Sequence, residues 1–279
     1  MLGIVLGLGS SVAWGVSDFL GGLQSRRISA LTVLLVTQPV GLALALAFAL
    51  IAGGDPLSRE DAILAVTGGA IVVGALGAFY RAMALGSISV VATIGALGVL
   101  VPIAGGLAQG EDPGLVSTLG VLLAVPGVVL AAREPDPEWR AAGRESIGLA
   151  ALAAVGFGTF FLRLDLSANQ EPAWTVVAAR SGGVVALLIA AAVVRPSMRI
   201  PASMAPALIA IGTCDVLANS LFAAATNHGL LTLIAVSGSI YGAVTVLLAR
   251  FVLGERLAAS QRAGVALAFL GVAVIAAGS

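Results

Sequence analysis

The sequence contains no lysine, one cysteine, one histidine and few charged residues of either sign. Charged residues make up 10% of the 279 residues, whereas a soluble domain carries about 25%. So little charge cannot cover a water-facing surface, so most of the chain must face lipid or pack against itself. Cys214 is alone, which excludes an internal disulfide and a cysteine-based metal site. The formal net charge of +0 argues against nucleic acid as a partner.

Enzyme signatures are missing as well. The chain has no HExxH, no GxxxxGK[ST] and no GxSxG motif, so we expect neither an enzyme nor a cofactor. An intramembrane hydrolase built on Asp18 and Asp215 is the enzymatic alternative, and no signature supports it. Without a nucleotide-binding motif, any transport must be driven by an ion gradient or by the gradient of the solute.

Apolar segments fill most of the chain: 59% of its residues are hydrophobic and the mean hydropathy is +1.09. Each segment is near the roughly 20 residues that a helix needs to cross a bilayer. They are apolar throughout rather than alternating, which favours helices over strands. The sequence therefore predicts an all-α integral membrane protein with about ten transmembrane helices, at residues 2–23, 30–52, 62–84, 88–108, 115–131, 147–166, 173–194, 205–226, 231–253 and 261–277.

The two halves of the chain repeat each other. Gly110-Glu111 matches Gly254-Glu255, and Gly120 matches Gly264 at the same offset, which indicates a duplication. The polar linker 134–146 separates a first repeat, 1–133, from a second, 147–279. Five helices is an odd number, so the second repeat starts on the other side of the membrane, and the repeats are inverted, as in secondary transporters.

Several residues carry a resemblance to a known family. The doubled five-helix plan, the Gly-Glu hinge before the last helix of each half, Trp14-Gly15 and Arg180 resemble the drug/metabolite transporter superfamily, in its ten-helix EamA-type branch. The resemblance implies transport of small solutes, since members export or take up amino acids, nucleobases, sugars and toxic organic compounds. This chain departs from the pattern at Thr37-Gln38, where the first half has no counterpart of Arg180.

Polar residues inside membrane helices are expensive unless they face the bundle interior, so they indicate a cavity. Trp14 and Asp18 share a helix face, which suggests a proton or cation site with an aromatic wall. The alternative is a carboxylate close enough to the helix end to meet interfacial water or to pair with Arg26 or Arg27. Arg163 takes the position equivalent to Asp18, so these two could pair across the repeats; alternatively, Arg163 extends to the interface.

Two further helices carry polar faces. Asp215 and Asn219 lie near the middle of the eighth segment and predict a functional group or a helix–helix hydrogen bond. Ser237 and Tyr241 lie on one face of the ninth segment, where they predict a ligand wall or ordinary packing. The cavity residues that we predict are Trp14, Asp18, Gln38, Tyr80, Arg163, Arg180, Asp215, Asn219, Ser237 and Tyr241.

The sequence thus predicts a multi-pass protein of the cell membrane, in a bacterium the inner membrane. Its function would be secondary transport of a small organic metabolite or drug-like solute, as an exporter, with protons as a possible coupling ion. The first alternative is uptake of a sugar or nucleobase. The second, from another class, is a non-transporting membrane scaffold or a lipid-handling subunit. Loop arginines gather on one side, which the positive-inside rule places in the cytoplasm with both termini outside; the family resemblance implies the reverse.

Overall fold

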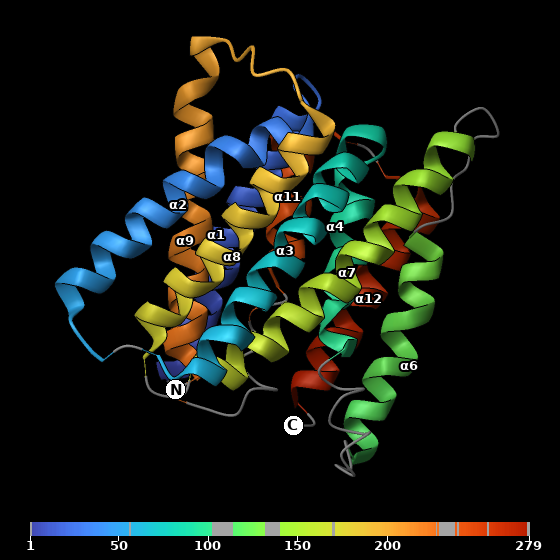
Figure 1. The fold of residues 1–279 in the computed structure, drawn as a ribbon. Coiled ribbons are helices and arrows are strands. Elements are labelled where there is room, and N and C mark those ends of the chain that lie inside the picture. Colours follow the sequence, from blue (N-terminus) through green and yellow to red (C-terminus); the bar gives the residue numbers. More distant parts are fainter. Residues whose placement is uncertain are drawn as a thin grey trace.

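The computed structural model describes residues 2–55, 57–101, 114–131, 140–168, 171–226, 228, 238, 240–255 and 257–277. Within these residues the chain forms ten α-helices and no strand (Figure 1). Each helix overlaps one of the predicted apolar segments. The helices are α1 (Leu2–Ser25), α2 (Ala30–Ala52), α3 (Arg59–Leu85), α4 (Ile88–Ala96), α6 (Gly114–Ala131), α7 (Arg140–Ala168), α8 (Pro172–Val194), α9 (Ala205–Thr226), α11 (Tyr241–Val252) and α12 (Ala259–Ala277).

Local sequence explains where several helices begin and end. Ser29, Ser58 and Ser87 each accept a hydrogen bond from the backbone N–H three residues later, so they cap the starts of α2, α3 and α4. Gly53 ends α2 at a φ of 77°, a left-handed conformation that glycine adopts without strain. The second repeat begins differently from its prediction, because α7 starts at Arg140 and takes in part of the linker.

Length and composition identify the membrane-spanning helices. In the described part of the chain, five helices are long and apolar enough to cross a bilayer: Ala30–Ala52, Arg59–Leu85, Gly143–Leu164, Pro172–Val194 and Ala202–Ala225. Shorter apolar helices occupy Tyr241–Val252 and Arg262–Gly271. The outer surface carries large apolar side chains such as Ile51 and Phe251, which are 86% and 81% exposed. Such a surface suits lipid rather than water.

The two halves interlock, and their contacts are symmetric. In these contacts α1 corresponds to α7, α3 to α9 and α4 to α11. Helix α1 packs on α9, and its counterpart α7 packs on α3; likewise α1 packs on α11, and α7 packs on α4. Three further pairs, α2 with α8, α4 with α11 and α6 with α12, join each helix to its own counterpart. Exchanging the first five helices with the last five leaves this pattern unchanged. A pseudo-twofold axis therefore relates the repeats and runs between the helices of these three pairs.

Hydrogen bonds show which helix ends lie together at one end of the bundle, called end A below. The Arg26 guanidinium donates to the carbonyl oxygens of Met83 and Gly86, at 3.2 and 3.1 Å. The Ser146 hydroxyl donates to the carbonyl of Ala82 at 3.0 Å. The C-terminal ends of α1 and α3 and the start of α7 therefore meet at end A.

The opposite end, end B, is marked by other contacts. The backbone N–H of Asp55 donates to the Glu171 carboxylate at 3.2 Å, which joins the α2–α3 turn to the start of α8. Helices α1 and α7, α2 and α8, and α3 and α9 therefore run in opposite directions, as inverted repeats require. Both termini lie at the same end of the bundle (Figure 1).

Candidate functional site

A cavity inside the bundle is lined by sixteen residues from both repeats. Helices α1, α2 and α3 of the first half contribute to it, together with α7, α8, α9 and α11 of the second. About 40 Å³ is open to the centre of a water molecule, which is room for a few waters. The lining residues are Trp14, Asp18, Gln38, Gly69, Val72, Leu76, Phe157, Phe160, Phe161, Leu164, Val176, Ala179, Arg180, Asp215, Asn219 and Tyr241.

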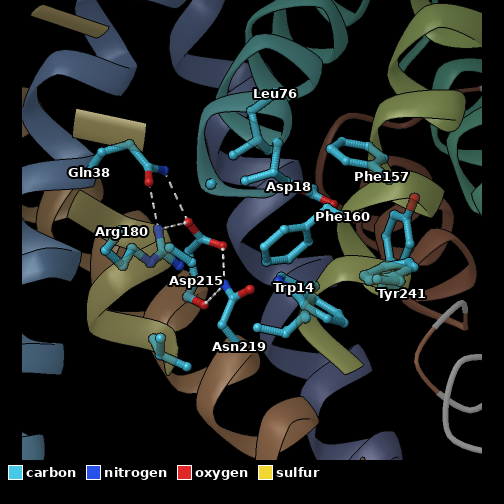
Figure 2. Close-up of a pocket in the computed structure, with 16 residues that line it drawn as sticks. Trp14, Asp18, Gln38, Leu76, Phe157, Phe160, Arg180, Asp215, Asn219 and Tyr241 are labelled. Atoms are coloured by element: carbon cyan, nitrogen blue, oxygen red, sulfur yellow. Dashed lines mark hydrogen bonds and ion pairs between the residues drawn. The ribbon is translucent and has the colours of Figure 1, made fainter. Parts of the chain in front are cut away.

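A buried ion pair forms one side of the cavity. Arg180 Nη1 lies 2.6 Å from Asp215 Oδ2, and the two side chains are 6% and 8% exposed. The same Nη1 donates to Gln38 Oε1 at 2.6 Å, while Gln38 Nε2 donates to Asp215 Oδ2 at 3.1 Å. Asn219 Nδ2 donates to Asp215 Oδ1 at 3.1 Å. Figure 2 shows this closed network, in which the ion pair of α8 and α9 is bridged by an amide from the first repeat.

Two buried polar atoms that belong to cavity-lining residues lack a hydrogen-bond partner. In the described part of the chain, Arg180 Nη2 and the Tyr241 hydroxyl are buried without a hydrogen bond. Buried polar groups are normally satisfied, because leaving one unpaired costs about 1–3 kcal/mol. Both atoms belong to residues that line the cavity, so a ligand there could satisfy them.

Aromatic rings build the other side of the cavity. The Trp14 ring lies 5.3 Å from that of Phe161 and 6.3 Å from that of Tyr241, centroid to centroid. Phe157 meets Tyr241 edge-on, also at 6.3 Å. These rings and Asp18 lie apart from the Arg180–Asp215 network (Figure 2). The wall suits an apolar or aromatic group on the ligand.

Asp18 lines this cavity and is buried. Its residue is 5% exposed, and no basic side chain in the described part of the chain forms an ion pair with it. The alternative pairing with Arg26 is wrong, because Arg26 instead forms an ion pair with Glu255 at 3.5 Å. The cavity therefore contains two carboxylates and one guanidinium, which leaves one carboxylate without a basic partner.

Seven of the ten predicted cavity residues line this site. They are Trp14, Asp18, Gln38, Arg180, Asp215, Asn219 and Tyr241. Tyr80 does not line it: the side chain is 1% exposed and its ring packs against Gly21. Ser237 lies outside the described residues.

The predicted ion pair between Asp18 and Arg163 is also wrong. Arg163 Nη1 donates to the Thr67 hydroxyl at 2.7 Å, and the residue does not line the cavity. Helix α1 packs on α9 and α11, whereas α7 packs on α3 and α4. Asp18 lies toward end A on α1 and Arg163 toward end B on α7, so these two side chains do not meet, although Trp14 and Phe161 of the same helices do.

The sequence prediction missed the aromatic face of α7. Phe157, Phe160 and Phe161 line the cavity, and their i, i+3, i+4 spacing places them on one helical face. That spacing could have identified them, although an apolar face in a membrane helix does not by itself distinguish a cavity from lipid.

Comparison with known proteins agrees with this fold. One crystal structure superimposes with a TM-score of 0.72 at 17% sequence identity, covering 98% of this chain and 95% of that chain. It is one of 27 chains of solved structures that match, and at this identity it shows the shared fold alone. No curated protein matches significantly. The model of the EamA-like transporter family matches residues 1–133 and 145–277, nearly the whole chain in two repeats, so this protein belongs to that family of membrane transporters.

Proposed function

We propose that this protein is a secondary active transporter that exports a small organic metabolite or drug-like solute across the cell membrane. Ten membrane-spanning helices in two inverted repeats would hold the solute in the cavity between the repeats. The observation that carries the proposal is this cavity, which both repeats build and which contains the buried Arg180–Asp215 pair. Secondary transporters with inverted repeats bind their substrates at such a position.

The lining suits an amphiphilic small molecule. Binding sites for small molecules are mostly apolar, with a few polar groups that orient the ligand. Here the rings of Trp14 and Phe161 would contact an apolar or aromatic group. The free Nη2 of Arg180 and the Tyr241 hydroxyl would bind an acceptor, and the Asp18 carboxylate a cationic group or a proton. The chain would need no cofactor and would perform no chemical reaction on the solute.

The small size of the cavity supports alternating access. The space that accepts the centre of a water molecule is about 40 Å³, which is room for a few waters, so admission of an organic solute would require the walls to move. Movement of one repeat relative to the other would open the cavity to each side in turn. Energy would come from an ion gradient or from the solute gradient, with protons the first choice because Asp18 has no basic partner among the described residues.

Flux into and out of proteoliposomes tests the proposal. The purified protein is reconstituted and offered a panel of amino acids, sugars, nucleobases and cationic dyes, with and without a pH gradient. Saturable, protein-dependent flux of one class is the expected result. The direction of gradient-driven accumulation distinguishes export from uptake. A scaffold or lipid-handling subunit would show no flux of any member, which would refute the proposal.

A matched pair of variants locates the site. Tyr241→Phe removes a hydroxyl without a partner and leaves the ring packing in place, so the KM of a solute that binds this hydroxyl should rise several-fold. Tyr80→Phe removes the other tyrosine hydroxyl of the chain, which lies outside the cavity, and should leave the KM unchanged. Equal effects of the two variants would show that the solute binds elsewhere.

A further inference from the structure

The repeated Gly-Glu motif has a structural role that the cavity does not explain. The Glu255 carboxylate, between α11 and α12, accepts hydrogen bonds from the α3–α4 turn of the other repeat. The Ser87 hydroxyl donates at 3.0 Å and the Ile88 N–H at 3.2 Å. Ser89 donates both its N–H, at 3.2 Å, and its hydroxyl, at 2.8 Å. A carboxylate at a helix N-terminus is stabilised by the free N–H groups and by the helix dipole.

Arg26 adds a third segment to this contact. Its Nη2 lies 3.5 Å from Glu255 Oε1, and the guanidinium also donates to the carbonyls of Met83 and Gly86. The Glu255 side chain is 17% exposed, so its charge-assisted bonds are better shielded from water than those of a surface pair. One carboxylate therefore ties the α1–α2, α3–α4 and α11–α12 turns together at end A.

The cavity is also closed toward this end. Its lining on α3 stops at Leu76, and the next turns toward end A carry Phe79, Tyr80 and Met83, each at most 1% exposed. Across the seam between the repeats, Gly242 of α11 packs against the backbone of Ala92 in α4. Within the described residues, packed side chains of α3 and the tight α4–α11 seam therefore lie between the cavity and end A.

We propose that Glu255 is the latch that holds end A closed, and that solute passes end A only after this carboxylate leaves the N-terminus of α4. The passage step rests on the proposed function, whereas the latch is a property of the fold. Helices α4 and α11 belong to opposite repeats and pack on each other at the pseudo-twofold axis, so rocking of the repeats must separate them.

The latch differs from an ordinary helix cap. Helix α4 already has its own cap, since the Ser87 side chain accepts a hydrogen bond from the Val90 N–H. That cap moves with its helix, whereas the Glu255 contact joins two bodies that move apart. Loss of Glu255 should therefore release the repeats from each other without unwinding α4.

A cysteine reporter in the seam tests the latch. Cys214→Ser gives a cysteine-free background, and Ala92→Cys places a thiol at a fully buried position of α4, at the residue whose backbone carbonyl packs against Gly242 of α11. A membrane-impermeant thiol reagent is applied to the side of end A, and the labelling rate is measured. Glu255→Ala should speed labelling by about tenfold or more, because it removes all the charge-assisted bonds. Glu255→Gln should have a smaller effect, because the amide oxygen still accepts.

Two controls keep the result decisive. Glu145→Gln is the counterpart of Glu255→Gln at an exposed ion pair of end A, in which Arg81 and Glu145 are 57% and 55% exposed. It should not alter labelling. A second reporter at Ala65, buried on α3 near end B, should not label faster in Glu255→Ala. Unchanged labelling at residue 92 in the folded variant overturns the latch, as does equal acceleration at both reporters, which would mean general loosening.

Partial and functional variants complete the test. If Glu255→Ala does not fold, Ser89→Ala removes one donor to the latch and should give an intermediate acceleration at the seam; no acceleration overturns the proposal. Flux by the wild-type protein is measured separately. If the wild type shows no flux but the latch variants label faster at residue 92, the transport function is refuted and the latch stands. If the wild type shows normal flux but labelling at residue 92 is unchanged in the variants, the latch is refuted and the transport function stands.

Discussion

The Arg180–Asp215 pair should show strong energetic coupling. Asp215→Asn leaves the Arg180 charge buried with only neutral acceptors, the new amide oxygen and Gln38, and Arg180→Gln leaves the Asp215 charge buried in turn. Both side chains are under a tenth exposed and the charged atoms are 2.6 Å apart. Removing one partner of such a pair costs about 3–5 kcal/mol, because the other charge stays desolvated. Each single variant should therefore be destabilised by about this amount.

The double variant should recover most of this loss. Arg180→Gln with Asp215→Asn leaves no buried charge at the pair, and its amides can bond to each other and to Gln38 and Asn219. If the singles cost about 3–5 kcal/mol each, independent effects would sum to about 6–10 kcal/mol. We expect the double variant to cost no more than either single, which is a coupling energy of about 3–5 kcal/mol.

Unfolding in detergent or lipid measures this coupling. Stabilities of the wild type, both singles and the double come from denaturant or thermal titration, with the folded fraction checked by size-exclusion chromatography. The control cycle uses Arg81→Gln and Glu145→Gln, an exposed pair at 3.7 Å, which should couple by about 0–1 kcal/mol. Costs that simply add at the Arg180–Asp215 pair would refute the reasoning.

Two further predictions follow from the site and from the charge distribution. Asp18→Asn should abolish solute accumulation driven by a pH gradient while solute exchange survives, because only net transport needs a protonatable group there; intact accumulation in proteoliposomes would exclude this carboxylate from coupling. For orientation, arginines gather at end A, around Arg26 and Arg195, so the positive-inside rule places end A in the cytoplasm. Alkaline phosphatase fused after Ser279 should then be active, and one inserted after Asp136 inactive; the reverse activities would mean that both termini are cytoplasmic.

Most of the helical plan could be predicted from sequence. In lipid every backbone N–H and C=O must be satisfied within the segment, so a continuous apolar run has to be a helix. The repeated Gly-Glu motif and the odd helix number then predicted inversion, and the opposite directions of α3 and α9 confirm it. The start of α7 was predicted less well, because the residues from Arg140 are polar and mark a linker by composition although they continue the helix.

The cavity residues could be predicted where the prediction depended only on the free-energy cost of placing a polar side chain in lipid. A buried polar residue in a membrane helix must face the bundle interior, and the structure brings four residues chosen by that argument together at one cavity: Trp14, Asp18, Asp215 and Asn219. The argument does not distinguish a cavity wall from a packed seam or a surface contact. Tyr80 and Arg163 were chosen by the same argument but do not line this cavity: Tyr80 is buried in the packed core, and Arg163 donates a hydrogen bond to Thr67.

Only the tertiary structure decided which polar groups meet. Inverted symmetry moves a position near end A to one near end B, so equivalent residues touch only at the axis. Gln38 and Arg180 lie on α2 and α8, which pack on each other at the axis, so they can form a hydrogen bond. Asp18 and Arg163 lie on α1 and α7, away from the axis, and do not meet. Residue types and spacing by themselves determined helices, repeats and a polar interior. Arg180 and Asp215 are 35 positions apart in the sequence, and Gln38 and Asp215 are 177 positions apart. Whether such residues pair depends on how the helices pack, which no local pattern encodes.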